Sequence, residues 1–265
     1  MKKLKYLLLL TTMLAAACKK VVNVDLRNAA PQIVIEGEVT DAPANYMVKI
    51  SKTVDFSASN TYPPVSGATV IITDSSAPHN SNQLREVDSG VYMTSDLVGI
   101  PLHTYILTVT IGDQLYTASS TMPAHVPLDS ITFAQNIGFN GQQEINAVVN
   151  FQDPPGTPNY YQFIEQDNDR LIPDIFVFED RLSDGRYIEE PLFNDSSYLQ
   201  RRDNLVLTMN CIDQNTYNYF FTLANISANN NGQSVTPSNP VSNITNGALG
   251  YFSAHTTERG VLQVY

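Results

Sequence analysis

The stretch TYILTVTIGDQLYTASST, residues 104–121, decides the class of fold that this sequence predicts. Apolar and polar side chains alternate along 104–111 and again along 114–121, and period-two alternation is typical of strands with one face in a core. Gly112-Asp113 between the two runs is a turn signal. The stretch therefore predicts two short strands joined by a turn.

The same alternation recurs on both sides of this stretch. Upstream it covers 32–39, 46–53, 67–73, 83–87 and 90–94, with turn signals at 40–45, 62–67 and 76–82. Seven strands spaced roughly ten residues apart predict an immunoglobulin-like or transthyretin-like β-sandwich over residues 31–122. Downstream of Pro123 and Pro127, further strands are expected at 130–137, 144–151, 160–166, 174–180, 203–210, 249–255 and 260–265.

One helix is expected within the downstream set, near residues 213–228. Tyr217, Phe220, Phe221 and Ala224 fall at helical spacing and form an apolar stripe. Asp213 is a natural N-cap, and 229–232 supplies the stop. The predicted fold is all-β, with two tandem β-sandwich domains at 31–122 and 128–265, the second carrying one covering α-helix.

The first residues read as an export signal. Three lysines are followed by an apolar run over 6–14 and then by Ala15-Ala16-Ala17-Cys18, which resembles a bacterial lipobox. We expect a signal peptide at 1–17, acylation of Cys18 and a tether over 18–30. The alternative is an ordinary secreted protein that is cut nearby and carries an incidental cysteine.

Charge and cysteine content limit the partners and the chemistry. The chain has a formal charge of −11, and removal of residues 1–17 takes away three lysines and leaves 12 basic against 26 acidic residues, or −14. This excess disfavours nucleic-acid binding because it repels phosphate. Cys211 is the other cysteine of the chain, and its apolar surroundings in LVLTMNCI indicate an inert buried thiol.

The sequence carries no recognisable motif for catalysis, a cofactor or a metal. The four histidines, at positions 79, 103, 125 and 255, lack metal-site spacing, and no nucleophile elbow or phosphate-binding loop occurs. We therefore expect no catalytic residues, no cofactor and no metal, with a hydrolase as a remote alternative. Acidic clusters at 165–170 and 178–186 leave a calcium site open, although Asp184-Gly185 is first of all a hairpin turn signal.

Four segments of the first half resemble the carboxypeptidase-regulatory or transthyretin-like sandwich. They are VIEGEVTD, PPVSGATVIITD, SGVYMT and GIPLHTYILTVTIGDQLYTASSTMP. Gly67-Ala68 and Gly90-Val91-Tyr92 stand at the positions where that pattern has its close strand approach and its tight turn. The resemblance implies a fold but names no function.

A wider resemblance covers nearly the whole chain, from Cys18 to about Arg259. The segments that carry it are CKKVVNVDL, IVIEGEVTD, PPVSGATVIITD, YTASSTMPAHVPLDSI, FQDPPGTPNYYQF and NPVSNITNGALGYFSAH. Together they resemble the domain-of-unknown-function family 4249 of Bacteroidota lipoproteins. The resemblance implies a protein anchored by lipid to the outer membrane and a role as an accessory or substrate-handling subunit of a TonB-dependent receptor. Lys19-Lys20 stands where acidic residues would favour surface display. The resemblance therefore implies outer-membrane anchoring without fixing on which face of the membrane the protein lies.

The long polar segment at 229–250 is the candidate contact loop. Loops of this length in compact domains are often functional, and we single out Asn239, Asn243, Asn246 and the adjacent Tyr251 as candidate contacts for the receptor or its ligand. The alternative is a solvated connector pinned by Gly247 and Gly250. For the whole chain, the alternative function is a free-standing ligand-binding or adhesive surface lipoprotein.

Overall fold

A computed structural model describes residues 30–54, 61–77, 80–137, 141, 143–194, 198–229 and 239–265. The predicted signal peptide, Cys18, all but the last residue of the tether, and His79 lie outside the described residues. The described part consists of strands, connecting turns and one α-helix, α2. The all-β class with a single helix is therefore confirmed.

The strands of the first half follow the predicted alternation closely. They are β1 (Ile33–Thr40), β2 (Met47–Lys52), β3 (Thr69–Asp74), β4 (Asn80–Gln83), β5 (Arg85–Asp88), β6 (Val91–Met93), β7 (Thr104–Ile111) and β8 (Gln114–Thr121). β7 and β8 pair from Thr104 opposite Thr121 to Ile111 opposite Gln114. The prediction of a turn over 76–82 was wrong at its end, where β4 pairs with β3. All four β4 side chains are polar, so apolar alternation could not reveal this strand.

The second half contributes the remaining strands and one further correction. They are β9 (Ser130–Ile137), β10 (Gln143–Gln152), β11 (Tyr160–Asp167), β12 (Arg170–Leu171), β13 (Phe176–Glu179), β14 (Tyr187–Leu192), β15 (Asn204–Ile212) and β16 (Leu249–Gln263). The two strands expected at 249–255 and 260–265 are one continuous strand, β16. The intervening polar residues 256–259 read as a break, but their backbone pairs with β15.

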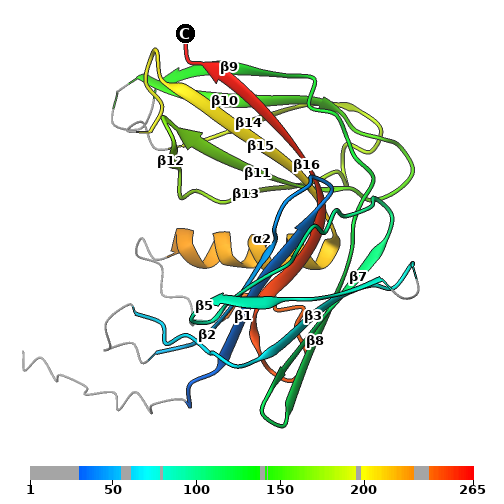
Figure 1. The fold of residues 1–265 in the computed structure, drawn as a ribbon. Helices are drawn as coiled ribbons and strands as arrows, with labels where there is room; N and C mark the ends of the chain where they lie inside the picture. Colours follow the sequence, from blue (N-terminus) through cyan, green and yellow to red (C-terminus); the bar gives the residue numbers. More distant parts are fainter. Residues whose placement is uncertain are drawn as a thin grey trace, which may run out of the picture. The chain divides into compact units, whose positions relative to one another are not determined.

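β16 joins the two halves of the fold within one sheet (Figure 1). Its first part pairs in parallel with β1, from Val34 opposite Leu249 to Thr40 opposite His255. Its second part pairs antiparallel with β15. The resulting sheet has the order β12-β11-β15-β16-β1-β2-β6-β5, with β13 on β11. Two smaller sheets, β14-β10-β9 and β4-β3-β7-β8, complete the architecture.

Two buried apolar clusters correspond to the two halves, and the first is discontinuous in sequence. It combines side chains between Ile35 and Met122 with Ile244, Ala248, Phe252 and Ala254. The second gathers side chains from Val126 to Val264, with aromatic packing of Phe151 against Tyr161. Residues just before β16 and in its first part, which lie within the second predicted domain (128–265), thus complete the first cluster.

Helix α2 (Gln214–Asn229) confirms the predicted helix and its cap, but its buried face is shifted. The Asp213 carboxylate accepts a hydrogen bond from the Thr216 N–H at 2.8 Å, which is N-cap geometry. Tyr217 and Tyr219 are buried, whereas Phe221, assigned to the apolar stripe, is 47% exposed. The helix lies against β11, β13 and β16 (Figure 1). In the described residues, no helix combines the length and apolarity needed to cross a membrane.

Gly250 is the position where the β1–β16 pairing tolerates no side chain. Its φ is +94°, and an added Cβ would overlap the Ile35 carbonyl of β1. Gly247 has a similar φ of +71° but open space around it. We expect Gly247→Ala to cost about 1–2 kcal/mol from backbone strain alone, and Gly250→Ala to cost several kcal/mol more or to prevent folding. Equal unfolding free energies for the two variants in chemical denaturation would contradict this reading of the strand pair.

Candidate functional site

Two loops next to the second apolar cluster form the candidate site. One follows β10 and spans residues 153–159, and the other follows β13 and spans residues 180–186. Pro154-Pro155 ends β10 because proline supplies no N–H for strand pairing. The second loop is not the hairpin that Asp184-Gly185 suggested: β13 pairs with β11 whereas β14 pairs with β10, so the loop crosses between two sheets.

Asp153, at the start of the first loop, connects the two loops through hydrogen bonds. Its side chain is fully buried. One carboxylate oxygen accepts the Tyr161 hydroxyl at 2.5 Å, and the other accepts the Gly185 N–H of the second loop at 2.9 Å. The Asp153 N–H also donates to the Arg186 carbonyl at 3.0 Å. The motif FQDPPGTPNYYQF therefore contains both the tie, Asp153, and one of its supports, Tyr161.

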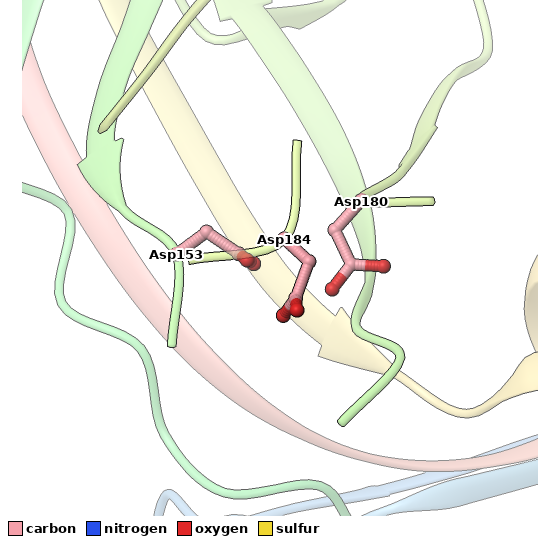
Figure 2. A group of neighbouring side chains, drawn as sticks. All are labelled: Asp153, Asp180 and Asp184. Carbon is pink, nitrogen blue, oxygen red and sulfur yellow. The ribbon is translucent and has the colours of Figure 1, made fainter. Parts of the chain in front are cut away.

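Two aspartates of the second loop make the reciprocal contacts. Asp180 accepts the Asn159 N–H at 3.0 Å, and Asp184 accepts the Gly156 N–H at 2.8 Å. Figure 2 shows the Asp180 and Asp184 carboxylates turned towards each other. Each loop thus holds the backbone of the other through its carboxylates. This mutual binding makes the pair of loops a rigid platform.

The three carboxylates concentrate negative charge in a small volume. Oxygen atoms of Asp153, Asp180 and Asp184 lie within 4.8 Å of one another. Asp180 is buried, and burial together with the charges of Asp153 and Asp184 raises its pKa, against hydrogen bonds from Asn159 that lower it. As calcium ligands they would supply three of the about six to eight oxygens that this ion takes. Their hydrogen bonds to the loop backbones account for their convergence without an ion.

A cleft of about 360 Å³ opens beside this platform. It is lined by Gly156, Thr157, Pro158, Tyr160, Glu179, Asp180, Arg181 and Asp184. The volume falls within the range of about 300–1,000 Å³ that is usual for ligand sites. Its walls combine an apolar side at Pro158 and Tyr160 with an acidic side, so the cleft suits binding of a ligand that has both characters.

An aromatic row leads from the cleft onto helix α2. The rings of Tyr160 and Tyr217 have centroids 5.1 Å apart, and Tyr217 stacks on Phe221 at 5.6 Å with an interplanar angle of 20°. This stacking explains how Phe221 is held although it is 47% exposed. The helical spacing of Tyr217 and Phe221 was visible in the sequence, but their approach to Tyr160 on β11 was not.

The second loop presents exposed side chains on its outer side. The Arg181 side chain is 76% exposed and its guanidinium lies 3.2 Å from the Glu179 carboxylate. Leu182 is 84% exposed and Tyr187 is 51% exposed. They border a further hollow of about 460 Å³ next to the same loop. The 180–186 loop thus lies between two hollows, the 360 Å³ cleft and the 460 Å³ hollow.

Of the predicted contact loop at 229–250, residues 230–238 lie outside the described residues, and two of the three predicted asparagines have structural contacts. Asn239 is exposed. The Asn243 side chain donates to the Phe252 carbonyl at 2.7 Å and accepts the Phe252 N–H at 3.0 Å. Asn246, with a φ of +59°, donates to the Gln114 side chain at 3.1 Å beside the β7–β8 turn.

Tyr251, the fourth predicted contact residue, belongs to an aromatic cluster on α2. Its ring centroid lies 4.9 Å from those of Tyr219 and Phe220. Neither Tyr251 nor the three asparagines are among the residues that line the cleft. A role for these four residues in ligand contact stays a prediction.

A serine–histidine pair is buried on the face of β16 opposite to Phe252 and Ala254 of the first core, and not at the cleft. The Ser253 hydroxyl and His255 Nδ1 lie 3.0 Å apart on one face of β16, and the two residues are 1% and 4% exposed. Burial lowers the pKa of His255 to about 4, so the imidazole is neutral at physiological pH. A substrate cannot reach this pair in the described fold, and we assign it to packing.

Glu165 is a second buried group whose pKa is strongly shifted by burial. One of its oxygens accepts the Asn194 amide at 2.6 Å, while the other has no hydrogen-bond partner among the described residues. Burial raises the pKa of Glu165 to about 7, with a smaller rise from Asp174 and against the Asn194 hydrogen bond. The acidic cluster at 165–170 therefore contains a buried carboxyl group.

Comparison with known families gives one match. The model of the family described as Domain of unknown function (DUF4249) matches residues 19–260, which include the two loops, the cleft and all but the end of β16. No match to a curated protein was found.

Removal of the Tyr161 hydroxyl tests the tie between the loops. In Tyr161→Phe, the fully buried Asp153 loses one of its two side-chain hydrogen bonds, and we expect a loss of about 1–3 kcal/mol in the free energy of unfolding. Tyr187→Phe is the matched control, because the exposed Tyr187 should tolerate the same change with a loss below about 0.5 kcal/mol. Equal losses in denaturant titrations would show that the hydroxyl does not support Asp153.

Glu165 makes stability depend on pH in a defined direction. Its folded pKa of about 7 lies above its ordinary value of 4.5, so stability is fully present below about pH 4.5 and falls until about pH 7, by roughly 3 kcal/mol. Glu165→Gln keeps the hydrogen bond from Asn194 and should remove this part of the decline. Unfolding free energies between pH 4.5 and 8 measure the difference. If the unfolding free energy of Glu165→Gln fell with pH as steeply as that of the parent, Glu165 would not be the cause of the decline. The same would follow if the control Glu189→Gln, at an exposed residue, removed the decline.

Proposed function

We propose that this chain, which belongs to the DUF4249 family, is a non-enzymatic lipoprotein of the bacterial outer membrane that serves as an accessory or substrate-handling subunit of a TonB-dependent receptor. Cys18 carries the lipid, residues 18–30 form the tether, and the loop platform contacts the partner or its cargo. The N-terminal sequence supports the lipid anchor, and the cleft beside the two loops supports the contact role.

The cleft beside the tied loops is the observation that carries the binding role. It is accessible, it combines apolar and charged lining, and its loops are fixed by their mutual hydrogen bonds. A site of this kind binds without a large ordering cost. By contrast, the groups that resemble catalytic machinery, Ser253 and His255, are buried away from it. These contacts favour recognition over chemistry.

The anchor follows from the N-terminal sequence. The run of small residues before Cys18 suits a lipoprotein signal, and more than one acyl chain makes membrane attachment durable. A tether over 18–30 reaches at most about 45 Å when extended. The folded unit that begins at Pro31 would then work close to the membrane surface.

Substitution of the two cysteines tests the anchor. We expect the wild-type chain to carry acyl groups on Cys18 in mass spectrometry and to partition with outer membranes. Cys18→Ala should move to the soluble fraction, whereas the control Cys211→Ala, which changes a buried thiol, should stay with the membrane. An unacylated mature N-terminus, or membrane retention of Cys18→Ala, would contradict the anchor.

Affinity purification of the wild-type chain from native envelopes tests the partnership. Co-purification of an outer-membrane receptor barrel is the expected result. Its absence under conditions that keep the lipidated chain intact would favour a free-standing binding or adhesive lipoprotein over a receptor subunit.

A further inference from the structure

We propose that the cleft between the two loops receives an arginine side chain from an extended segment of a partner protein. This inference rests on the proposed function, because it specifies the chemistry by which a receptor or its protein cargo would be recognised. The partner would present the guanidinium to the acidic side of the cleft, between Asp180 and Asp184, and lay its neighbouring residues along the aromatic row.

The charge of the cleft calls for a cation. Glu179, Asp180 and Asp184 line it together with a single basic residue, Arg181, whose guanidinium is 3.2 Å from Glu179. Both hydrogen bonds that the Asp180 carboxylate receives come from Asn159 and reach the same oxygen, Oδ2. Within the described part of the chain, Oδ1 of this buried residue has no hydrogen bond. An anionic ligand would be repelled here, and a neutral apolar ligand would desolvate carboxylates without compensation.

The aromatic wall favours guanidinium among cations. Tyr160 lines the cleft, and its ring continues into Tyr217 and Phe221. A guanidinium is planar, stacks on aromatic faces and pairs with a carboxylate through two parallel hydrogen bonds. An ammonium group is a strongly hydrated point charge and uses this combination less well. The exposed ring of Phe221 adds apolar surface for the residues that flank the arginine.

The rigidity of the two loops supports a binding role for the acidic side. Asp180 and Asp184 are held in place by the backbone N–H groups of Asn159 and Gly156, so a ligand need not order them. Preorganised charges of this kind contribute specificity and fast association. A hard metal ion is the competing occupant, and the experiment must separate it from a side chain.

The test uses the full mature, lipidated chain in detergent micelles and a five-residue acetylated and amidated peptide with a central arginine. A citrulline peptide, which removes the charge but keeps the shape, and a lysine peptide are titrated in parallel by calorimetry. We expect the arginine peptide to bind about tenfold more tightly than the citrulline peptide, and more tightly than the lysine peptide, with an affinity that falls as salt is added.

Two variants and a control locate the binding. Asp180→Asn and Asp184→Asn keep an acceptor for the Asn159 and Gly156 N–H groups and remove one charge each, and each should weaken arginine-peptide binding about tenfold. Asp113→Asn removes the same charge at the exposed β7–β8 turn and should leave the affinity unchanged. If a variant fails to fold, its circular dichroism spectrum will show it, and the other variant decides.

Several results would overturn the inference. They are equal binding of the arginine and citrulline peptides, an equal effect of Asp113→Asn, or the absence of peptide binding. Calcium chloride is titrated separately. Stoichiometric calcium binding that Asp184→Asn abolishes, in a chain that does not bind the peptide, would make the cleft an ion site. The purification of a receptor with the lipidated chain does not use these peptides. If a receptor co-purified but the arginine peptide did not bind, this inference would be wrong and the proposed function would stand.

Discussion

The fold depends on one strand, β16, which pairs with β1 along its first part and with β15 along its second. Val34 and Leu249 are 215 residues apart in the chain and opposite each other in the sheet. Parallel pairing over such a separation forms slowly, because the loop must close before the contacts stabilise it. Gly250 allows the two backbones to meet, and Phe252 then enters the first core. Because the second part of β16 pairs with β15, the strands of both halves of the protein depend on the placement of this one strand.

Alternation in the sequence was sufficient to locate strands that bury one face. β7, β8 and β9 have the bounds that it predicts. It failed where the reason for strand formation lies outside the segment: β4 is polar and is held by β3, and residues 256–259 continue β16 because β15 pairs with them. The helix was located for the same kind of local reason, but its buried face depends on Tyr251, which approaches Tyr219 from a distant strand.

The candidate site shows the same division between local and long-range information. The motif FQDPPGTPNYYQF and the acidic cluster at 178–186 were both visible as unusual segments. Their combination was not, because the two loops meet only after β10 and β13 have entered different sheets. Asp153 is buried at their junction, and a buried carboxylate is tolerated only with hydrogen bonds. Tyr161 and Gly185 supply them. Because Asp153 needs both hydrogen bonds, the second loop is held at a fixed distance from the first, and this sets the geometry of the cleft beside them.

Perturbed pKa values often mark functional sites, but those of Glu165 and His255 arise from packing. The shifts to about 7 at Glu165 and to about 4 at His255 come first from burial, at residues that are 1% and 4% exposed. Neither side chain lines the cleft. A general acid or base must reach the proton that it transfers, and these groups cannot do so in the described fold. The accessible cleft instead offers fixed charge and aromatic surface, which are the means of recognition. Asp180, whose pKa burial and the neighbouring carboxylates raise, lines this cleft, so the proposed binding role rests on the cleft's charge and aromatic wall and not on Glu165 or His255.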